Sequence, residues 1–347
     1  MTGPFVAGVD LGGTAINYTL LDARGDFLVD GLCEFPSRAR EGPDVCLRQI
    51  AAGFQQLAGG LGLSPDDVVA IGLDTPGPAT ASGVLSTAGS TNFLHSGWAR
   101  FDLRGRLEAL LCKPVTYLND GNAAALWGHY VLFGDDRDAT TVTAVIGTGL
   151  GGGIVVGDRV LTGANGFGGE IGHVLLPYQS IPMMGELKPQ CNCGRTGDLE
   201  SLCSLTAIES SLLPFFLARE ADHELAAVDV HIAATRVRGL AEQGDAMCRQ
   251  IFRVQAQALG LFFDQMVNVF DPDALIVGGG ALEVGEEFQA WFVGEIRAGM
   301  PTARREQEGI PIRVMPNGDS AGARGAAVYA WRSHRVQPAA GRQEFIC

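Results

Sequence analysis

Two cysteines one residue apart, Cys191 and Cys193, mark the part of the sequence with the most specific chemistry. They begin the stretch CNCGRTGDLE, in which two thiolates beside a glycine-containing turn are typical of half a metal site. The chain starts with MTGPFVAGVDLGG, which is not the basic and then apolar pattern of a secretory signal. We therefore expect a reduced, cytoplasmic protein, in which metal binding is favoured over a disulfide for this pair.

A glutamate and a histidine precede these cysteines in the stretch GGEIGH. Glu170 and His173 are three positions apart, so on a helical turn they would share one face. A lone histidine is more often a core or surface residue than a ligand. Its place shortly before Cys191 favours the metal interpretation.

Glycine-rich turns form the second group of residues that could do chemistry. The stretch DLGGT, residues 10–14, has an acid followed by two glycines. Backbone N–H groups of such a turn can bind phosphate, and the carboxylate can hold hydrated Mg²⁺. An ordinary hairpin turn would have the same residues. The stretches GTGLGGG, residues 147–153, and IVGGG, residues 276–280, repeat the pattern, which favours a nucleotide clamped between two domains.

The stretch NDGNAAAL lies where an expected strand ends and an expected helix begins. There, Asp120 could accept the proton of an attacking hydroxyl group, as a general base does in phosphoryl transfer. The alternative is structural, because Asn119 or Asp120 could cap a helix that begins near Asn122. The spacing alone leaves both interpretations open.

The elements that must position these residues alternate between strands and helices, which predicts an α/β protein. Strands are expected over residues 5–10, 16–21, 27–35 and 68–73, with another at the start of KPVTYLND. Helices are expected over residues 45–59, 199–219 and 246–269, and over the stretches GNAAALWGHYVLF and GARGAAVYAW. The pattern of strand, glycine turn and strand recurs at residues 141–163, which predicts two similar domains. A dinucleotide-binding fold would instead follow its first glycines with a helix.

The composition is that of a folded protein with a sizeable core. The chain has 347 residues, of which 46% are hydrophobic and 18% charged, and two domains are the expectation for this length. The net charge of −14 argues against a nucleic-acid partner, which requires a basic face. No apolar run is long enough to cross a membrane.

Together these stretches resemble the ROK family of sugar kinases and repressors, within the superfamily of actin-like ATPases and hexokinases. EIGH followed by CNCGRTGDLE is similar to the family signature E-x-G-H and then C-x-C-G-x-x-G-C-x-E. The resemblance implies duplicated actin-like (ribonuclease H-like) α/β domains with an interdomain cleft. We expect a smaller domain over residues 1–118, completed by a helix near 322–333, and a larger domain with the zinc loop over 119–320.

The resemblance also implies roles for individual residues. Asp120 matches the base that activates the 6-hydroxyl group of a hexose. The positions that match sugar contacts are Gly77, Asn92, Asn119, Asp120, Glu170, His173 and Glu200. The positions that match the binding site for Mg-ATP are Asp10, Gly12, Gly13, Thr14, Gly147, Thr148, Gly149, Gly151, Gly279 and Gly280.

The zinc signature departs from the family at one position. The family ligands correspond to His173, Cys191, Cys193 and position 198, where this chain has Asp198 instead of cysteine. A carboxylate oxygen is an acceptable zinc ligand, so a structural His-Cys-Cys-Asp site is expected. Alternatively, Asp198 caps a helix that starts at position 199, or Cys203 is a substitute ligand. Losing the zinc is expected to harm sugar binding rather than phosphate chemistry.

The resemblance implies an ATP-dependent, glucokinase-like hexose kinase that forms a homodimer. A kinase for N-acetylmannosamine, N-acetylglucosamine or an amino sugar such as kanosamine is an alternative. A non-catalytic, sugar-sensing repressor is less favoured, since such proteins carry a helix-turn-helix segment before the first glycine turn, and only nine residues precede Asp10 here.

Overall fold

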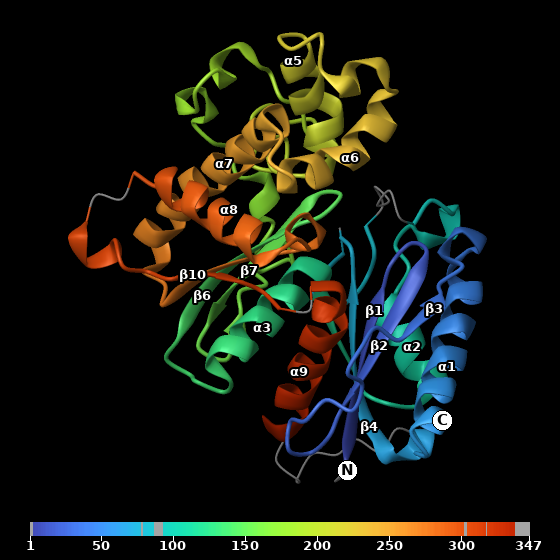
Figure 1. The fold of residues 1–347 in the computed structure, drawn as a ribbon. Helices are drawn as coiled ribbons and strands as arrows, with labels where there is room; N and C mark the ends of the chain where they lie inside the picture. Colours follow the sequence, from blue (N-terminus) through green and yellow to red (C-terminus); the bar gives the residue numbers. More distant parts are fainter. Residues whose placement is uncertain (1–2, 78, 87–92, 302–303, 317, 337–347) are drawn as a thin grey trace. The chain divides into compact units, whose positions relative to one another are not determined.

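The computed structural model describes residues 3–77, 79–86, 93–301, 304–316 and 318–336 (Figure 1). Its contacts divide the chain into two compact units. The first comprises Met1–Asp136, Asp158–Gly169 and Asp319–Cys347, and the second comprises Arg137–Gly157 and Glu170–Gly318. Asn92, a predicted sugar contact, lies outside the described residues.

The first unit is built on a mixed five-stranded sheet with the order β3-β2-β1-β4-β5. Its strands are β1 (Phe5–Leu11), β2 (Ala15–Leu21), β3 (Glu34–Pro36), β4 (Val68–Thr75) and β5 (Val115–Asn119). Its helices are α1 (Pro43–Gly60), α2 (Leu103–Leu111), α3 (Asp120–Phe133) and α9 (Ala321–Val336). β1 is antiparallel to β2 and parallel to β4, and β4 is parallel to β5.

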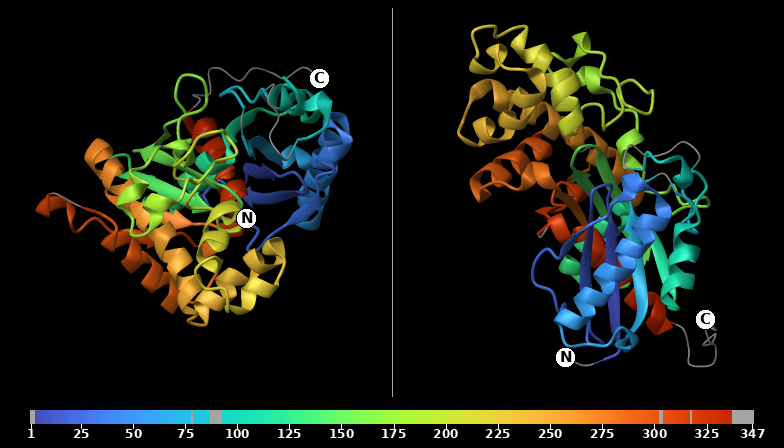
Figure 2. Two further views of the ribbon diagram at one scale, coloured as in Figure 1. Left: turned by 90° about the horizontal axis from the view of Figure 1, so that it is seen from above. Right: turned by 90° about the vertical axis from the view of Figure 1, so that its right-hand side faces the viewer.

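Side chains of β1 alternate between the two faces of this sheet, as the period of two requires. Ala7, Val9 and Leu11 belong to the core that includes residues of α1 and α2. Val6 belongs to a separate cluster with Ala327 and Trp331 of α9. Figures 1 and 2 show α9 and the strands side by side. Asp10, four positions after Val6, therefore faces α9.

Helix α9 approaches the sheet so closely that only glycine fits beneath it. A Cβ atom on Gly8 would lie 1.9 Å from the carbonyl oxygen of Ala323, and one on Gly72 would lie 1.9 Å from that of Ala326. Absence of a side chain at both positions lets backbone meet backbone. The last described helix thus packs directly on the two strands that carry Asp10 and Asp74.

The second unit repeats the pattern of the first. Its sheet has the order β10-β9-β6-β7-β8, with β6 antiparallel to β7 and parallel to β9, and β9 parallel to β10. The strands are β6 (Thr140–Ile146), β7 (Leu150–Val156), β8 (Arg159–Val160), β9 (Ala274–Gly278) and β10 (Ile312–Val314). By its contacts, the short edge strand β8 belongs to the first unit. The predicted duplication of an actin-like α/β fold is therefore confirmed.

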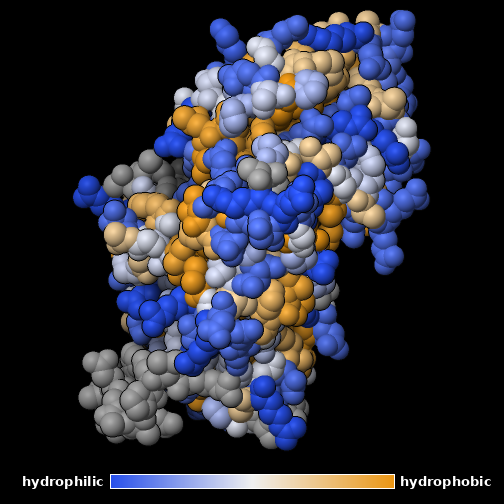
Figure 3. Space-filling model, turned by 90° about the vertical axis from the view of Figure 1, so that its left-hand side faces the viewer, coloured by the Kyte–Doolittle hydropathy of each residue, from blue (hydrophilic) through white to orange (hydrophobic). Residues whose placement is uncertain are grey.

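The helices of the second unit are longer and carry much of its core. They are α4 (Leu205–Ala207), α5 (Leu213–Leu217), α6 (Val230–Glu242), α7 (Ala246–Phe270) and α8 (Glu286–Ala298). Phe252 of α7 packs edge-on against Phe288 and Phe292 of α8, and all three rings are buried. No described helix combines the length and the apolar character needed to cross a membrane. On the face shown in Figure 3, hydrophobic side chains reach the surface between hydrophilic ones.

Two predicted elements were wrong. The strand expected over residues 27–35 is interrupted, because only a bridge at Phe27 and the strand Glu34–Pro36 form. Between them, the guanidinium of Arg324, which lies 5.0 Å from the rings of Phe27 and Trp127, donates to the carbonyl groups of Val29 and Asp30. The carbonyl groups of Val29 and Asp30 therefore bind Arg324, while Leu28 and Cys33 still make backbone hydrogen bonds to β2.

The helix expected over residues 199–219 begins at Leu205 instead. Residues 198–204 form turns in which Asp198 accepts from the backbone N–H of Ser201. The helical stretch then contains a π-helical turn, Ile208–Leu212, before α5. Helices α2, α6 and α8 were not predicted.

Candidate functional site

In the first unit, Asp10 lies near the end of β1, directly before the first glycine turn. It is paired across the sheet with Asn17 of β2 on one side and Asp74 of β4 on the other. Asn17 Nδ2 donates to Asp10 Oδ2 at 3.3 Å. Gly12, Gly13 and Thr14 form the tight turn between β1 and β2, closed by a 2.9 Å hydrogen bond from Gly12 N–H to the carbonyl of Ala15.

Asp74 is an acidic residue of this region that the sequence reasoning missed. It is 0% exposed, and among the described residues its carboxylate oxygens have no hydrogen-bond partner apart from the adjoining carboxyl group of Asp10. A Cβ atom on Gly322 would lie 3.0 Å from Asp10 Cγ and 3.1 Å from Asp74 Oδ1. Both carboxyl groups therefore meet beneath the first turn of α9. The signal available was the stretch LDTPG, where an acid ends a buried strand as Asp10 does.

The environment of these two acids disfavours their charged forms. Burial, followed by the charges of Asp10 and Asp120, raises the pKa of Asp74 well above its ordinary value. Burial also raises the pKa of Asp10, although polar contacts with Asp74 and Asn17 oppose that shift. Two carboxyl groups this close in a poorly hydrated place stay charged together only if a cation compensates them. Without a cation, one of them keeps its proton.

Asn119 and Asp120 join β5 to α3. Asn119 is the N-cap of α3, since its Oδ1 accepts from Gly121 N–H at 2.9 Å. The helix begins at Asp120, earlier than predicted, and Asp120 lies in its first turn, where the helix dipole favours a negative charge. Because β4 and β5 pair Thr75 with Asn119, the ends of β1, β4 and β5 carry Asp10, Asp74 and Asp120 in order. Gly77 follows β4.

In the second unit, the predicted phosphate turn lies between β6 and β7. Gly147 N–H donates to the carbonyl of Gly149, and the carbonyl of Thr148 accepts from both the backbone and the hydroxyl of Thr206. Gly151 lies within β7, where it pairs with Val145, rather than in the turn itself. Gly279 has a left-handed φ of 94°, and Gly280 begins the short helical turn after β9.

Glu200 lies next to this turn, which the sequence had not indicated. Its Oε2 accepts from Leu150 N–H at 2.8 Å. A Cβ atom on Gly149 would lie 2.5 Å from the same oxygen, so glycine is required there for Glu200 to reach the backbone. Its Oε1 accepts from the thiol of Cys191 at 3.3 Å. Glu200 therefore connects the glycine turn to the cysteine loop.

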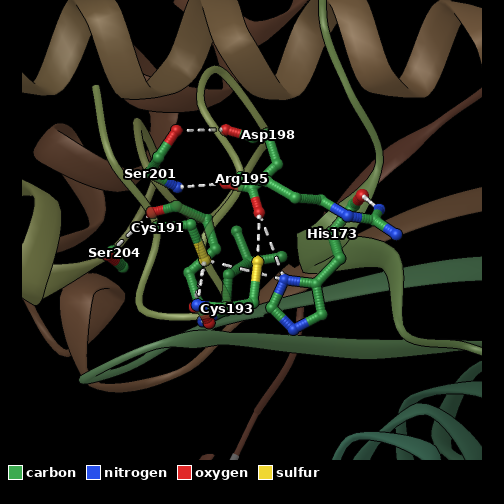
Figure 4. A network of polar contacts seen from close by, with 9 residues as sticks. His173, Cys191, Cys193, Arg195, Asp198, Ser201 and Ser204 are labelled. Carbon is green, nitrogen blue, oxygen red and sulfur yellow. Dashed lines mark hydrogen bonds and ion pairs between the residues drawn. The ribbon is translucent and has the colours of Figure 1, made fainter. Parts of the chain in front are cut away.

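The structure brings His173, Cys191, Cys193 and Asp198 together, with one potential ligand atom of each within 4.8 Å of the others (Figure 4). His173 Nδ1 lies 3.2 Å from Asp198 Oδ2 and 3.7 Å from Cys191 Sγ, and Cys193 Sγ lies 3.4 Å from Asp198 Oδ2. Ligand atoms at the corners of a tetrahedron with zinc bonds of about 2.0–2.3 Å lie about 3.3–3.8 Å apart. The donor set and its spacing therefore fit zinc.

The surroundings of Asp198 favour its charged form. Burial opposes the charge, but hydrogen bonds from Cys191, Ser201 N–H, His173 and Cys193 leave the pKa of Asp198 below its ordinary value. Asp198 Oδ1 accepts from Ser201 N–H at 2.9 Å, while Oδ2 faces His173 and Cys193. Asp198 thus caps a turn with one oxygen and offers the other as a ligand. Cys203 is buried and is not among the four grouped residues.

Glu170 precedes the short helical turn Ile171–His173. Burial of its carboxyl group raises its pKa, His173 opposes this shift, and Glu200 adds to it. The backbone brings these three predicted sugar contacts together within the second unit, because His173 N–H donates to the carbonyl of Glu170 and Glu200 N–H donates to that of Gly172.

A second group that could hold a metal, His223, Asp245 and Cys248, is explained without one. His223 Nδ1 accepts from Leu225 N–H, and Nε2 contacts Asp245 Oδ2 at 3.2 Å. Asp245 Oδ1 accepts from Cys248 N–H at 2.8 Å and caps α7. The side chains of His223 and Asp245 are therefore occupied as helix caps.

Comparison with known proteins gives consistent matches over nearly the whole chain. A model of the ROK family matches residues 6–333. A glucokinase of Halalkalibacterium halodurans is 30% identical over 327 residues, covering 93% of each chain. An N-acetylmannosamine kinase of Escherichia coli is 30% identical over 276 residues, covering 78% of this chain and 81% of that protein. A xylose repressor of Caldicellulosiruptor bescii is 26% identical and covers 82% of this chain and 67% of its own.

Solved structures match equally far along the chain. A ROK hexokinase from Thermus thermophilus is 28% identical, with a TM-score of 0.75 over 96% of this chain and 100% of that one. A ROK family glucokinase from Streptomyces griseus, in complex with glucose and AMPPNP, is 26% identical, with a TM-score of 0.71 over 94% and 99% of the two chains.

Proposed function

The chain belongs to the ROK family, and from this premise we propose that it is an ATP-dependent sugar kinase that phosphorylates the 6-hydroxyl group of a hexose. Asp120 is the general base. It accepts the proton as the hydroxyl oxygen attacks the γ-phosphorus of ATP, and the bond from that phosphorus to the bridging oxygen of ADP breaks. Magnesium, when bound with ATP, neutralises charge on the phosphate oxygens.

The observation that carries the proposal is the arrangement at the start of α3. Asn119 supplies the helix cap. Asp120 Oδ1 accepts from the same Gly121 N–H at 2.7 Å, so this N–H would keep an acceptor if the Asp120 side chain were used elsewhere. Asp120 sits in the first helical turn, at the end of the row formed with Asp10 and Asp74. A carboxylate at this position, next to a residue that already caps the helix, supports a chemical role.

The remaining roles follow the predicted positions. We assign sugar recognition to Glu170, His173 and Glu200, together with Gly77, Asn92 and Asn119. Asp10 and the glycine turns would hold Mg-ATP through a carboxylate and backbone N–H groups. Zinc on His173, Cys191, Cys193 and Asp198 would be structural and would fix the orientation of His173. Glucose is the first candidate acceptor, and an N-acetylhexosamine or amino sugar is the second.

The test is ADP release from Mg-ATP with a panel of hexoses, N-acetylhexosamines and aminohexoses. We expect turnover on one sugar, and loss of that turnover in Asp120→Asn with sugar binding retained. Asp44→Asn is the control, because this carboxylate lies on the surface with 69% of its side chain exposed. Absence of turnover on every sugar by folded, zinc-loaded protein that still binds a sugar would refute the kinase and indicate a sugar-binding regulator.

A further inference from the structure

Asp74 has an unusual environment for a side chain in the interior of a sheet. It is fully buried, and its carboxylate oxygens have no hydrogen-bond partner among the described residues other than the carboxyl group of Asp10, itself an acid. The neighbouring polar groups do not explain it, because Thr75 and Tyr117 satisfy each other through a hydroxyl–hydroxyl bond of 2.7 Å. A buried carboxylate without a partner destabilises a fold, so stability alone does not account for Asp74.

The direct neighbour of Asp74 in the sheet is Asp10. Their Cα atoms are partners in the parallel pairing of β1 and β4, and a Cβ atom at Gly322 would touch both carboxyl groups, at 3.0 and 3.1 Å. Asp10 is held on its other side by Asn17 Nδ2. The Oδ1 atom of Asn17 is also buried without a partner in the described part of the chain.

These unpartnered atoms are all oxygens, and two of the three groups that face one another are carboxylates. Hard divalent cations bind such oxygen sets, usually through one or two carboxylates with water and phosphate oxygens completing the shell. A divalent cation also removes the repulsion between two adjacent carboxylates, which a neutral ligand cannot do. The arrangement therefore favours a small divalent cation over an uncharged ligand.

We infer that Asp74 is a second carboxylate of the magnesium site that Asp10 forms, and that the pair together holds the divalent cation of the nucleotide. The inference rests on the proposed function for the identity of the nucleotide, but not for the binding of the metal. Because Asp74 is fully buried, it contributes its charge beside Asp10 and not by contact with the sugar. Asp120, at the end of the next strand, remains the base.

The experiment is a titration of the full-length protein with Mn²⁺ in the presence of ADP, followed by the electron paramagnetic resonance of free Mn²⁺. Asp74→Asn keeps the shape of the side chain and removes its charge. Loss of such a supporting group typically weakens metal affinity about 10- to 100-fold, and we expect a rise of that size in the Kd for Mn²⁺. Asp264→Asn is the matched control, since Asp264 also has a buried, unpartnered oxygen but lies on α7, in the other unit. Its Kd should equal that of the wild type.

A second measurement on the unaltered protein avoids dependence on the folding of a variant. Fe²⁺ bound in place of Mg²⁺, with ascorbate and peroxide, should cut the backbone at both β1 and β4, and Mg²⁺ should suppress both cuts. Cleavage at β1 alone, or a Kd of Asp74→Asn within twofold of the wild type, would overturn the inference. Failure of the kinase proposal would look different, because the wild type would then bind Mn²⁺ normally without releasing ADP in the presence of any sugar.

Discussion

Replacement of Asp198 by asparagine tests whether a carboxylate takes the place of the missing cysteine in the metal site. Asn keeps an oxygen for Ser201 N–H, which now donates to Asp198 Oδ1 at 2.9 Å, so the turn should survive. It removes the anionic Oδ2 that lies 3.2 Å from His173 Nδ1 and 3.4 Å from Cys193 Sγ. The substitution therefore isolates the metal-binding role from the capping role.

The magnitude follows from the number of ligands. Structural zinc sites with four ligands bind with an apparent free energy of about 10–16 kcal/mol at pH 7, so an equal share per ligand is about 2.5–4 kcal/mol. At about 1.4 kcal/mol for each factor of ten, loss of one ligand weakens binding by about 100- to 1,000-fold. We expect Asp198→Asn to lose zinc to a chelator at a correspondingly lower concentration.

The assay is zinc content by mass spectrometry together with competition against a coloured chelator. Asp198→Cys is the control, because it supplies a thiolate at the same position and should bind zinc at least as tightly as the wild type. Unchanged zinc affinity in Asp198→Asn, with zinc lost instead in Cys203→Ser, would refute the assignment and make Cys203 the fourth ligand.

Three further predictions concern packing, the glycine turn and pH. Gly72→Ala should destabilise the protein by about 1–3 kcal/mol or more in urea unfolding, since the new methyl group would lie 1.9 Å from the backbone of α9. The control is Gly239→Ala inside α6, where a new methyl group would meet nothing within 4 Å. This variant should be more stable than the wild type by up to about 1 kcal/mol. Gly149→Ala should displace Glu200 and lower kcat by up to about 100-fold, with little change in the unfolding midpoint. An unchanged kcat would show that the position of Glu200 does not affect the rate of the reaction. Burial raises the pKa of Asp264, so its contribution to stability is complete below its unfolded pKa of about 3.9 and is lost as the pH rises through the folded pKa. Asp264→Asn should therefore gain stability over the wild type at neutral pH and lose that advantage near pH 4, and a pH-independent difference would contradict this.

Local patterns were enough to predict much of the fold. Alternation of apolar residues and the glycine turns predicted β1, β2, β6 and β7, and their repetition predicted the duplicated sheets. The spacing of Cys191 and Cys193, with His173 before them, identified three of the four residues of the candidate metal site.

What the sequence did not predict depends on contacts between distant segments. Asp74 becomes notable only when β4 is placed beside β1, which brings it next to Asp10 from 64 positions away. The strand expected after Phe27 is interrupted where Arg324, almost 300 positions later, donates to the carbonyl groups of Val29 and Asp30. Likewise, the link from Glu200 to Leu150 spans 50 positions and has no sequence signature.

The place of α9 in the first unit has a consequence for how the protein matures during synthesis. Asp10 and Asp74 are translated early, but Gly322, which covers both, leaves the ribosome only after the whole second unit has been made. Until then the growing chain has β1 and β4, which carry Asp10 and Asp74, without the helix that covers these two side chains. The cation site proposed for Asp10 and Asp74 would therefore be completed only when α9, the last described helix, has been synthesised.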